Sequence, residues 1–298
     1  MNILLFGKNG QLGWALQQEL VPRVGVITVD VDSTEYCGDF CNLAGVAETV
    51  RLVKPVVIIN TAAYTDVAQA EQRPELALQV NAVGVERLAA LAKQYDALLV
   101  HFSTDYVFDG TGQRPWRESD QPAPLNVYGQ SKWAGEQAII ASGCRYLIIR
   151  TSWLHSPWRA NFLKTMLRLG QERAELQVVC DQVGAPTSAS MLAKVTLQAI
   201  DKVLAKPELG GLYHVAVRGA VSWYDYAGFM FKEAERLGLI TSQPKLMAVA
   251  SHDYPSVVAR PLNSRLDVQR FERNFDLQLP DWRSGVSETL FALSQESL

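Results

Sequence analysis

Short apolar runs alternate with amphipathic stretches through the first half of the chain. Five of these runs are short and nearly continuous, at residues 2–6, 25–30, 56–60, 98–102 and 146–150. Runs of this kind are typical of strands that are buried on both faces of a parallel sheet. Helices are expected between them, at residues 12–20, 46–53, 74–95 and 131–141. The alternation predicts an α/β fold with a doubly wound parallel Rossmann sheet.

The pattern becomes less regular after residue 150, where aromatic residues and prolines are more frequent. Helical segments are expected at residues 162–169, 191–203, 223–237 and 284–293. We therefore predict a smaller, mostly helical C-terminal region that covers a ligand. Residues 1–152 would form the dinucleotide-binding domain, and the chain would return to it around 183–216. Residues 153–182 and 217–298 would form the substrate-binding region.

A glycine loop joins the first predicted strand to the first predicted helix. Its sequence is Gly7-Lys-Asn-Gly10-Gln11-Leu12-Gly13. Glycines here permit a tight turn, close approach of a pyrophosphate and close packing of the helix on the sheet. The helix N-terminus would direct its free N–H groups at the phosphates. The spacing favours a nucleotide site, and the alternative is a structural turn.

Further cofactor contacts are expected where the next strands end. Asp30 ends the second predicted strand, where an acid typically binds the adenosine ribose hydroxyls and favours NADH over NADPH. A solvated strand-end acid is the alternative. Asp39 and Phe40 follow a turn and are candidates for contact with adenine. Small residues after the third strand would let a cofactor lie against the backbone, and this segment comprises Ala62, Ala63, Tyr64 and Thr65.

Candidate catalytic residues come from a YxxxK pattern and a strand-end hydroxyl. Tyr128 and Lys132 are four residues apart, so they share one face of a predicted helix. A nearby ammonium is expected to lower the tyrosine pKa from about 10, and Tyr128 would donate a proton to a carbonyl oxygen as hydride reaches its carbon. Thr104 follows the fourth strand and would bind the same oxygen. The alternative is a partly buried tyrosine beside a surface lysine.

Long ordered motifs extend this pattern over nearly the whole chain. They are Gly7–Gly13, Cys37–Phe40, Ser103–Gly110, Pro124–Lys132, Arg150–Trp153, Asn161–Met166, Asp181–Thr187 and Arg260–Arg265. Together they resemble the extended short-chain dehydrogenases/reductases, and within these the dTDP-4-dehydrorhamnose reductase family.

The resemblance implies an activity, a cofactor and roles for residues. The activity is reduction of the 4-keto group of dTDP-6-deoxy-L-lyxo-4-hexulose to dTDP-L-rhamnose, the last step of dTDP-rhamnose synthesis. The cofactor is NADPH, with NADH accepted as well, and a nucleotide sugar is the partner. Catalysis is implied for Thr104, Tyr128 and Lys132. Cofactor binding is implied for Gly10, Gln11, Leu12, Asp30, Asp39, Phe40, Ala63, Tyr64 and Thr65.

The substrate side is less defined by the sequence. Trp153 follows the fifth strand and is a candidate for packing against a sugar or a base, with a core position as the alternative. Arg260 suits a diphosphate because its guanidinium can bind two oxygens. Asp105, Asn161 and Gln182 are further candidates for polar contacts.

The sequence gives little indication of a metal. Some members of the resembled family are dimers bridged by a metal on a glutamate early in the first helix, but here that position reads Gly13-Trp-Ala-Leu16. A monomer or a metal-free homodimer is therefore expected, and Mg²⁺ rests on the resemblance alone. The four cysteines lack zinc-site spacing, and the four histidines are expected to be structural.

Composition excludes some classes and leaves two rivals. A net charge of −3 and the absence of a long apolar run argue against nucleic-acid and membrane partners, so a cytoplasmic protein is expected. One rival is a nucleotide-sugar dehydratase or epimerase, although Thr104-Asp105 is followed by Tyr106 instead of the glutamate expected in a dehydratase. The other is a non-catalytic regulatory subunit, against which the intact Thr104, Tyr128 and Lys132 argue.

Overall fold

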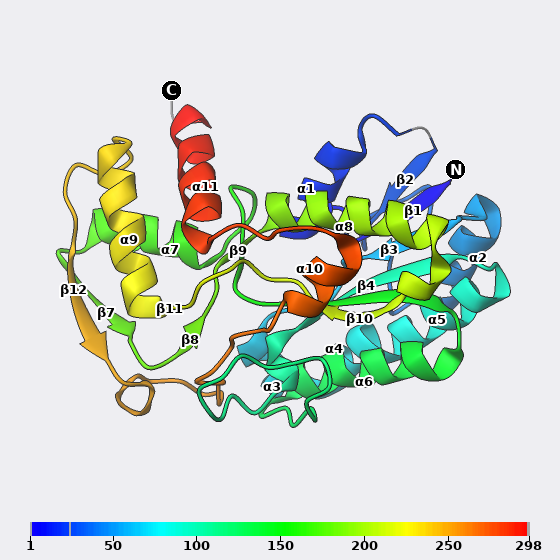
Figure 1. Ribbon diagram of the computed structural model, residues 1–298, viewed down its shortest axis with the longest axis horizontal. Helices are drawn as coiled ribbons and strands as arrows, with labels where there is room; N and C mark the ends of the chain where they lie inside the picture. Colours follow the sequence, from blue (N-terminus) through cyan, green and yellow to red (C-terminus); the bar gives the residue numbers. More distant parts are fainter. Residues whose placement is uncertain (1, 24, 297–298) are drawn as a thin grey trace.

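Six parallel strands form the central sheet of the computed structural model, which describes residues 2–23 and 25–296. Their spatial order is β10-β5-β4-β3-β1-β2 (Figure 1). The strands are β1 (Ile3–Phe6), β2 (Val26–Val29), β3 (Val57–Asn60), β4 (Leu98–Thr104), β5 (Arg145–Thr151) and β10 (Gly211–His214). The five predicted strands and the doubly wound fold are confirmed. The sixth strand, β10, was missed because it begins with glycine and ends with histidine, so it is not the continuous apolar run that marks the other strands.

Both faces of the sheet are covered, as the continuous apolar runs require. Ile3 and Leu5 face one apolar cluster, whereas Leu4 and Phe6 face another. On the first side lie α1 (Gln11–Leu20) and α8 (Ala189–Ala205), which pack on each other. On the second lie α2 (Leu43–Val53), α5 (Gly84–Gln94) and α6 (Val127–Ser142). Alternate side chains of one strand are thus buried in opposite directions.

The helix predicted over residues 74–95 is interrupted. It divides into α4 (Pro74–Leu78), a π-helical turn η1 (Gln79–Val83) and α5, and α3 (Val67–Gln72) precedes it. Asn81, within the π turn, accepts from Tyr64 N at 2.8 Å and donates to Ser131 Oγ at 3.0 Å. The turn therefore links the segment after β3 to α6, which is consistent with the frequent occurrence of π turns near functional sites.

The C-terminal region gathers around a third apolar cluster. Its helices are α7 (Phe162–Glu172), α9 (Trp223–Arg236) and α11 (Trp282–Glu296), and β7 (Glu175–Val179) pairs in parallel with β12 (Lys245–Val249). By contrast, α10 (Gln269–Phe275) packs on β10 and joins the first apolar cluster. Figure 1 shows α7, α9 and α11 beside the end of the sheet. The four helices predicted after residue 150 correspond to α7, α8 (Ala189–Ala205), α9 and α11, whereas α10 and the β7–β12 pair were not predicted. Within residues 2–23 and 25–296, no helix combines the length and apolar composition that a membrane span needs.

The segment around 183–216 contributes to both parts of the molecule. Short strands β6 (Leu154–His155) and β9 (Thr187–Ser188) pair in parallel, and β8 (Val183–Gly184) pairs with β11 (Val221–Ser222). After them α8 packs against α1 and β10 pairs with β5. The division of the chain into two domains at the predicted boundaries stays a prediction.

Candidate active site

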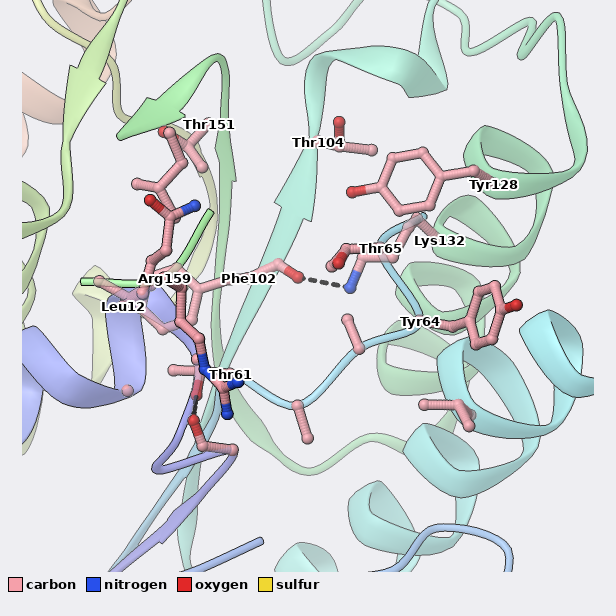
Figure 2. Close-up of a pocket in the computed structure, with 18 of the residues that line it drawn as sticks. Leu12, Thr61, Tyr64, Thr65, Phe102, Thr104, Tyr128, Lys132, Thr151 and Arg159 are labelled. Carbon is pink, nitrogen blue, oxygen red and sulfur yellow. Dashed lines mark hydrogen bonds between the residues drawn. The ribbon is translucent and has the colours of Figure 1, made fainter. Parts of the chain in front are cut away.

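A cavity of about 980 Å³ lies at the carboxyl ends of β1, β3, β4 and β5. Strand order reverses around β1, and ligands of open α/β sheets bind at such a switch point. Figure 2 shows Leu12 and Arg159 on one side of the cavity, with Tyr128, Lys132 and Tyr64 on the other. Predicted site residues on its wall are Gly7, Gly10, Gln11, Leu12, Gly13, Asp30, Asp39, Phe40, Ala62, Ala63, Tyr64, Thr65, Thr104, Asp105, Tyr128, Lys132, Trp153 and Arg260.

The glycine loop has the geometry that its sequence predicts. Gly7 has a φ of +84°, and a Cβ there would lie 2.5 Å from the Ala62 nitrogen. A Cβ on Gly13 would lie 1.9 Å from the Gly7 carbonyl oxygen, so the helix could not pack this closely with any other residue. Gly10 is the N-cap of α1, and no side chain caps this helix. The loop therefore leaves helix N–H donors available to a phosphate beside the cavity.

Asp30 holds the glycine loop as well as lining the cavity. Its carboxylate accepts hydrogen bonds from Asn9 N at 2.9 Å and from Val31 N at 2.8 Å. The loop is thereby tied to the end of β2. Asp39 and Phe40 line the same part of the wall, and Phe40 also packs on Phe6 with ring centroids 5.4 Å apart. These positions suit the adenosine end of a dinucleotide.

The proposed proton donor lies in the first turn of α6. Asn126 caps this helix by accepting from Gly129 N at 2.8 Å, so α6 starts at Val127 and not near residue 131 as predicted. Tyr128 packs edge-to-face on Tyr106, with centroids 5.7 Å apart. Thr104 ends β4 and, with Lys132, faces the same cavity (Figure 2). The structure thus brings the three predicted catalytic residues together.

Burial, and not Lys132, dominates the electrostatics of Tyr128. Burial raises the pKa of the Tyr128 phenol far above its usual value, and a hydrogen bond with Thr104 opposes this only in part. Burial also lowers the pKa of Lys132 to about 8, against the opposing influence of Glu136. The Lys132 Nζ donates to the Phe102 carbonyl at 2.7 Å. The predicted lowering of the tyrosine pKa is therefore wrong, because desolvation is the largest influence on this buried phenol.

Three buried polar atoms of cavity-lining residues have no hydrogen-bond partner among the described residues. They are Ser103 Oγ, Asp105 Oδ2 and Thr151 Oγ1. Burial raises the pKa of Asp105 to about 7, although hydrogen bonds with Ser264 and Thr104 oppose the rise. Because buried polar groups are normally paired, these atoms mark a place where a polar ligand would complete the hydrogen bonding.

Trp153 and Arg260, two of the predicted substrate contacts, both line the cavity. Trp153, with a φ of +48°, stacks on Trp223 at 3.5 Å between centroids, and both rings line the cavity. The indole is therefore packed on another indole while it borders the cavity. Arg260 also lines the cavity, and its charge counteracts the burial that raises the pKa of Tyr106 to about 12.

Two predicted substrate contacts do not reach the cavity wall. Asn161 caps α7 by accepting from Lys164 N at 3.1 Å, and its amide donates to Gln11 Oε1 at 2.9 Å. Gln182 donates to Ser251 Oγ at 3.0 Å. Neither is a cavity-lining residue. Their amides already have protein partners, and their role as substrate contacts stays a prediction.

Sequence reasoning missed the segment between β6 and α7. Arg159 lines the cavity, has a φ of +65°, and donates from Nε to the Asn9 carbonyl at 2.8 Å. Trp158 Nε1 donates to the same carbonyl at 3.1 Å and its ring stacks on Trp14. Neither residue belongs to a recognisable motif. About 150 positions separate them from the glycine loop, so only the fold reveals the contact.

The structure gives no support for a bound magnesium ion. Among residues 2–23 and 25–296, no group of three or more His, Cys, Asp or Glu side chains is placed to hold a metal. At the start of α1 the side chains are Trp14, which stacks on Trp158, and the buried Ala15. Magnesium was considered possible on the resemblance alone, and no donor set among the described residues supports it.

The fold and the site define an oxidoreductase of the extended short-chain dehydrogenase/reductase class. The family model for the RmlD substrate binding domain matches residues 1–295. dTDP-4-dehydrorhamnose reductases from Escherichia coli K12 and Salmonella typhimurium LT2 are 51% and 52% identical over 97% of both chains. A Bacillus anthracis dTDP-4-dehydrorhamnose reductase in complex with NADP is 36% identical, with a TM-score of 0.89 over 98% of this chain and 100% of that one. The chain belongs to the dTDP-4-dehydrorhamnose reductase family.

Proposed function

We propose that the protein reduces the 4-keto group of dTDP-6-deoxy-L-lyxo-4-hexulose to give dTDP-L-rhamnose, with NADPH as reductant and NADH as a second choice. The observation that carries the proposal is the convergence of Thr104, Tyr128 and Lys132 on one cavity, behind a glycine loop of dinucleotide-binding geometry. Family membership supplies the substrate, and the Bacillus anthracis relative in complex with NADP supports NADPH.

The residues of the cavity fit a dinucleotide. The uncapped start of α1 would hold the pyrophosphate, while Asp30, Asp39 and Phe40 would border the adenosine. The backbone of residues 62–65 would lie along the nicotinamide half, and Asn81 fixes that backbone through Tyr64. When bound, the reduced nicotinamide supplies the hydride.

Tyr128 performs the proton transfer in this proposal. Its burial keeps the phenol protonated until charge builds on the sugar oxygen, and it then donates its proton there. Thr104 provides a second donor to the same oxygen, which stabilises the developing charge. Lys132, once protonated, donates to the cofactor ribose and favours the phenolate that remains on Tyr128.

The rival functions lack supporting residues at this site. A dehydratase needs a second acid after Asp105, but Tyr106 occupies that position and packs edge-to-face on Tyr128. A regulatory subunit has no need for three catalytic side chains around one cavity. An intact trio therefore favours the reductase.

A panel of 4-keto sugars linked to dTDP, UDP and GDP tests the proposal. Loss of NADPH absorbance with the dTDP sugar, and formation of dTDP-L-rhamnose, is the expected result. Turnover only with a UDP or GDP sugar would reject the dTDP assignment, and no NADPH loss with any sugar would reject the reductase.

We further propose that the protein works without a bridging metal, as a monomer or a metal-free homodimer. The basis is the start of α1, where Trp14 and Ala15 offer no carboxylate. Size-exclusion chromatography should give one elution volume with and without EDTA. A shift to smaller size with EDTA would contradict this.

A further inference from the structure

A chain of buried polar groups connects Lys132 to the end of β3. The Ala62 N–H donates to Asn60 Oδ1 at 3.1 Å, and Asn60 Nδ2 lies 3.1 Å from His101 Nδ1. His101 Nε2 in turn lies 3.3 Å from Lys132 Nζ. Asn60 and His101 are neighbours across the β3–β4 pair and are fully buried. Polar side chains in such a position are costly unless every donor meets an acceptor.

The donors and acceptors along this chain fix the proton on His101. Because the Ala62 N–H can only donate, Asn60 must turn its oxygen toward it, and the amide N–H₂ then faces His101. His101 Nδ1 is therefore an acceptor, and the single proton of the neutral imidazole lies on Nε2. Burial lowers the pKa of His101 well below its usual value, which agrees with a neutral ring.

The Nε2–H of His101 thus points at the nitrogen of Lys132. An ammonium has three N–H donors and no lone pair, whereas an uncharged amine has one lone pair that can accept. Lys132 Nζ already donates to the Phe102 carbonyl. If the imidazole proton were on Nδ1 instead, the Asn60 amide would have to turn its oxygen toward His101. Its N–H₂ group would then face the Ala62 N–H, so that two donors would meet without an acceptor. Only the amine satisfies every group.

Other ionisable groups around α6 are accounted for. Glu136, one turn beyond Lys132, favours the ammonium, but its carboxylate is paired with Arg150 of β5 at 2.9 and 2.6 Å. Asp105 and Tyr106 act on Tyr128. Two further ionisable groups contact the ends of the helix: Glu71 of α3 accepts from Val127 N, and Lys93 of α5 donates to Ser142 O. His101 is the ionisable residue of β4 that faces the lysine.

We infer that His101 is a positioning residue for the proposed reduction: fixed by Asn60 as the Nε2–H tautomer, it favours the uncharged amine of Lys132 over the ammonium and holds this amine against β4 until cofactor binds. The inference rests on the proposed function for its link to catalysis. Lys132 must then take up a proton when it turns to the cofactor. The alkaline limb is the pH above which kcat/KM declines. Its position therefore depends on how strongly His101 favours the uncharged amine of Lys132.

Two amide substitutions separate this role from simple packing. In His101→Gln the amide nitrogen lies near the position of Nε2 and keeps a donor for Lys132. In His101→Asn the shorter amide lies near Nδ1, so the donor is lost. His101→Asn should move the alkaline limb up by about 0.4–1 pH unit, the net strength of one hydrogen bond, whereas His101→Gln should keep the limb of the parent.

A buried histidine far from the site provides the matched control. His214 of β10 is as buried as His101, and its ring bonds with the Trp116 carbonyl. His214→Asn should leave the limb unchanged. If His101→Asn and His101→Gln shift the limb equally, or neither shifts it, the inference is overturned.

NMR of the imidazole nitrogens tests the same inference without any substitution or substrate. In the cofactor-free protein, the His101 ring should give the pattern of a neutral Nε2–H tautomer, assigned by its loss in His101→Gln. An Nδ1–H tautomer or a charged ring would overturn the inference. Because this measurement needs no turnover, it distinguishes a failure of the inference from a failure of the proposed reductase activity.

Discussion

Replacing Asp105 by asparagine should remove much of the pH dependence of the protein's stability. Asp105 is 2% exposed at the start of η2 (Asp105–Val107), and its Oδ2 has no hydrogen-bond partner among the described residues. Burial raises its pKa from 3.8 to about 7. The folded protein therefore binds this proton more tightly than the unfolded chain does.

The sign and the size follow from that difference. The stabilising contribution of the protonated carboxyl is complete below pH 3.8 and is lost as the pH rises through about 7. A rise from 3.8 to about 7 corresponds to about 4 kcal/mol. About 2–3 kcal/mol of this loss falls between pH 5 and pH 8.

Urea unfolding at pH 5 and at pH 8 measures this loss. Between pH 5 and pH 8, the free energy of unfolding should decrease in the parent by about 2–3 kcal/mol more than it does in Asp105→Asn. Asp276→Asn is the control, because Asp276 is exposed at a left-handed C-cap that asparagine also adopts. If Asp105→Asn and the parent lose the same stability, burial does not set the pKa of Asp105.

Three further predictions concern the catalytic, structural and cofactor-binding parts of the site. Tyr128→Phe should lower kcat by at least about 10²-fold in NADPH-oxidation assays while NADPH still binds, and near-normal kcat would exclude Tyr128 as the acid. Glu136→Gln should cost about 3–5 kcal/mol in urea unfolding, because it leaves the 3%-exposed Arg150 side chain charged and unpaired; a loss below about 1 kcal/mol would refute this. Arg159→Ala should weaken NADPH and NADH binding about 10-fold in fluorescence titrations, with Arg168→Ala on α7 as the control. If Arg159→Ala weakens the binding of NADPH but not that of NADH, Arg159 instead contacts the 2′-phosphate, which only NADPH carries.

The sheet was predictable because its signal is local. Each strand of the first half is an apolar run too short to form a buried helix, and Gly7 and Gly13 each have a steric reason that is visible in the structure. β10 carries a weaker signal, since its sequence Gly-Leu-Tyr-His interrupts apolar residues with a glycine and a histidine. The π turn at Gln79–Val83 was hidden because its residues are ordinary helix formers.

The site residues that lie at the ends of strands could be predicted from the sequence. Thr104, Asp105 and residues 62–65 come directly after β4 or β3, so parallel topology brings them to one edge. Arg159, Trp223 and Arg260 arrive from distant segments, so their position depends on tertiary packing. Protonation states were the least predictable part: whether the Lys132 charge or burial sets the pKa of Tyr128 depends on distances that spacing does not give.

Transfer of deuterium from NADPH labelled at the nicotinamide C4 to the sugar tests the central claim most directly. With the dTDP-linked 4-keto sugar as substrate, mass spectrometry and NMR should find one deuterium at C4 of dTDP-L-rhamnose. Formation of that product without deuterium at C4, or deuterium at another carbon, would contradict hydride transfer to the carbonyl beside Thr104 and Tyr128.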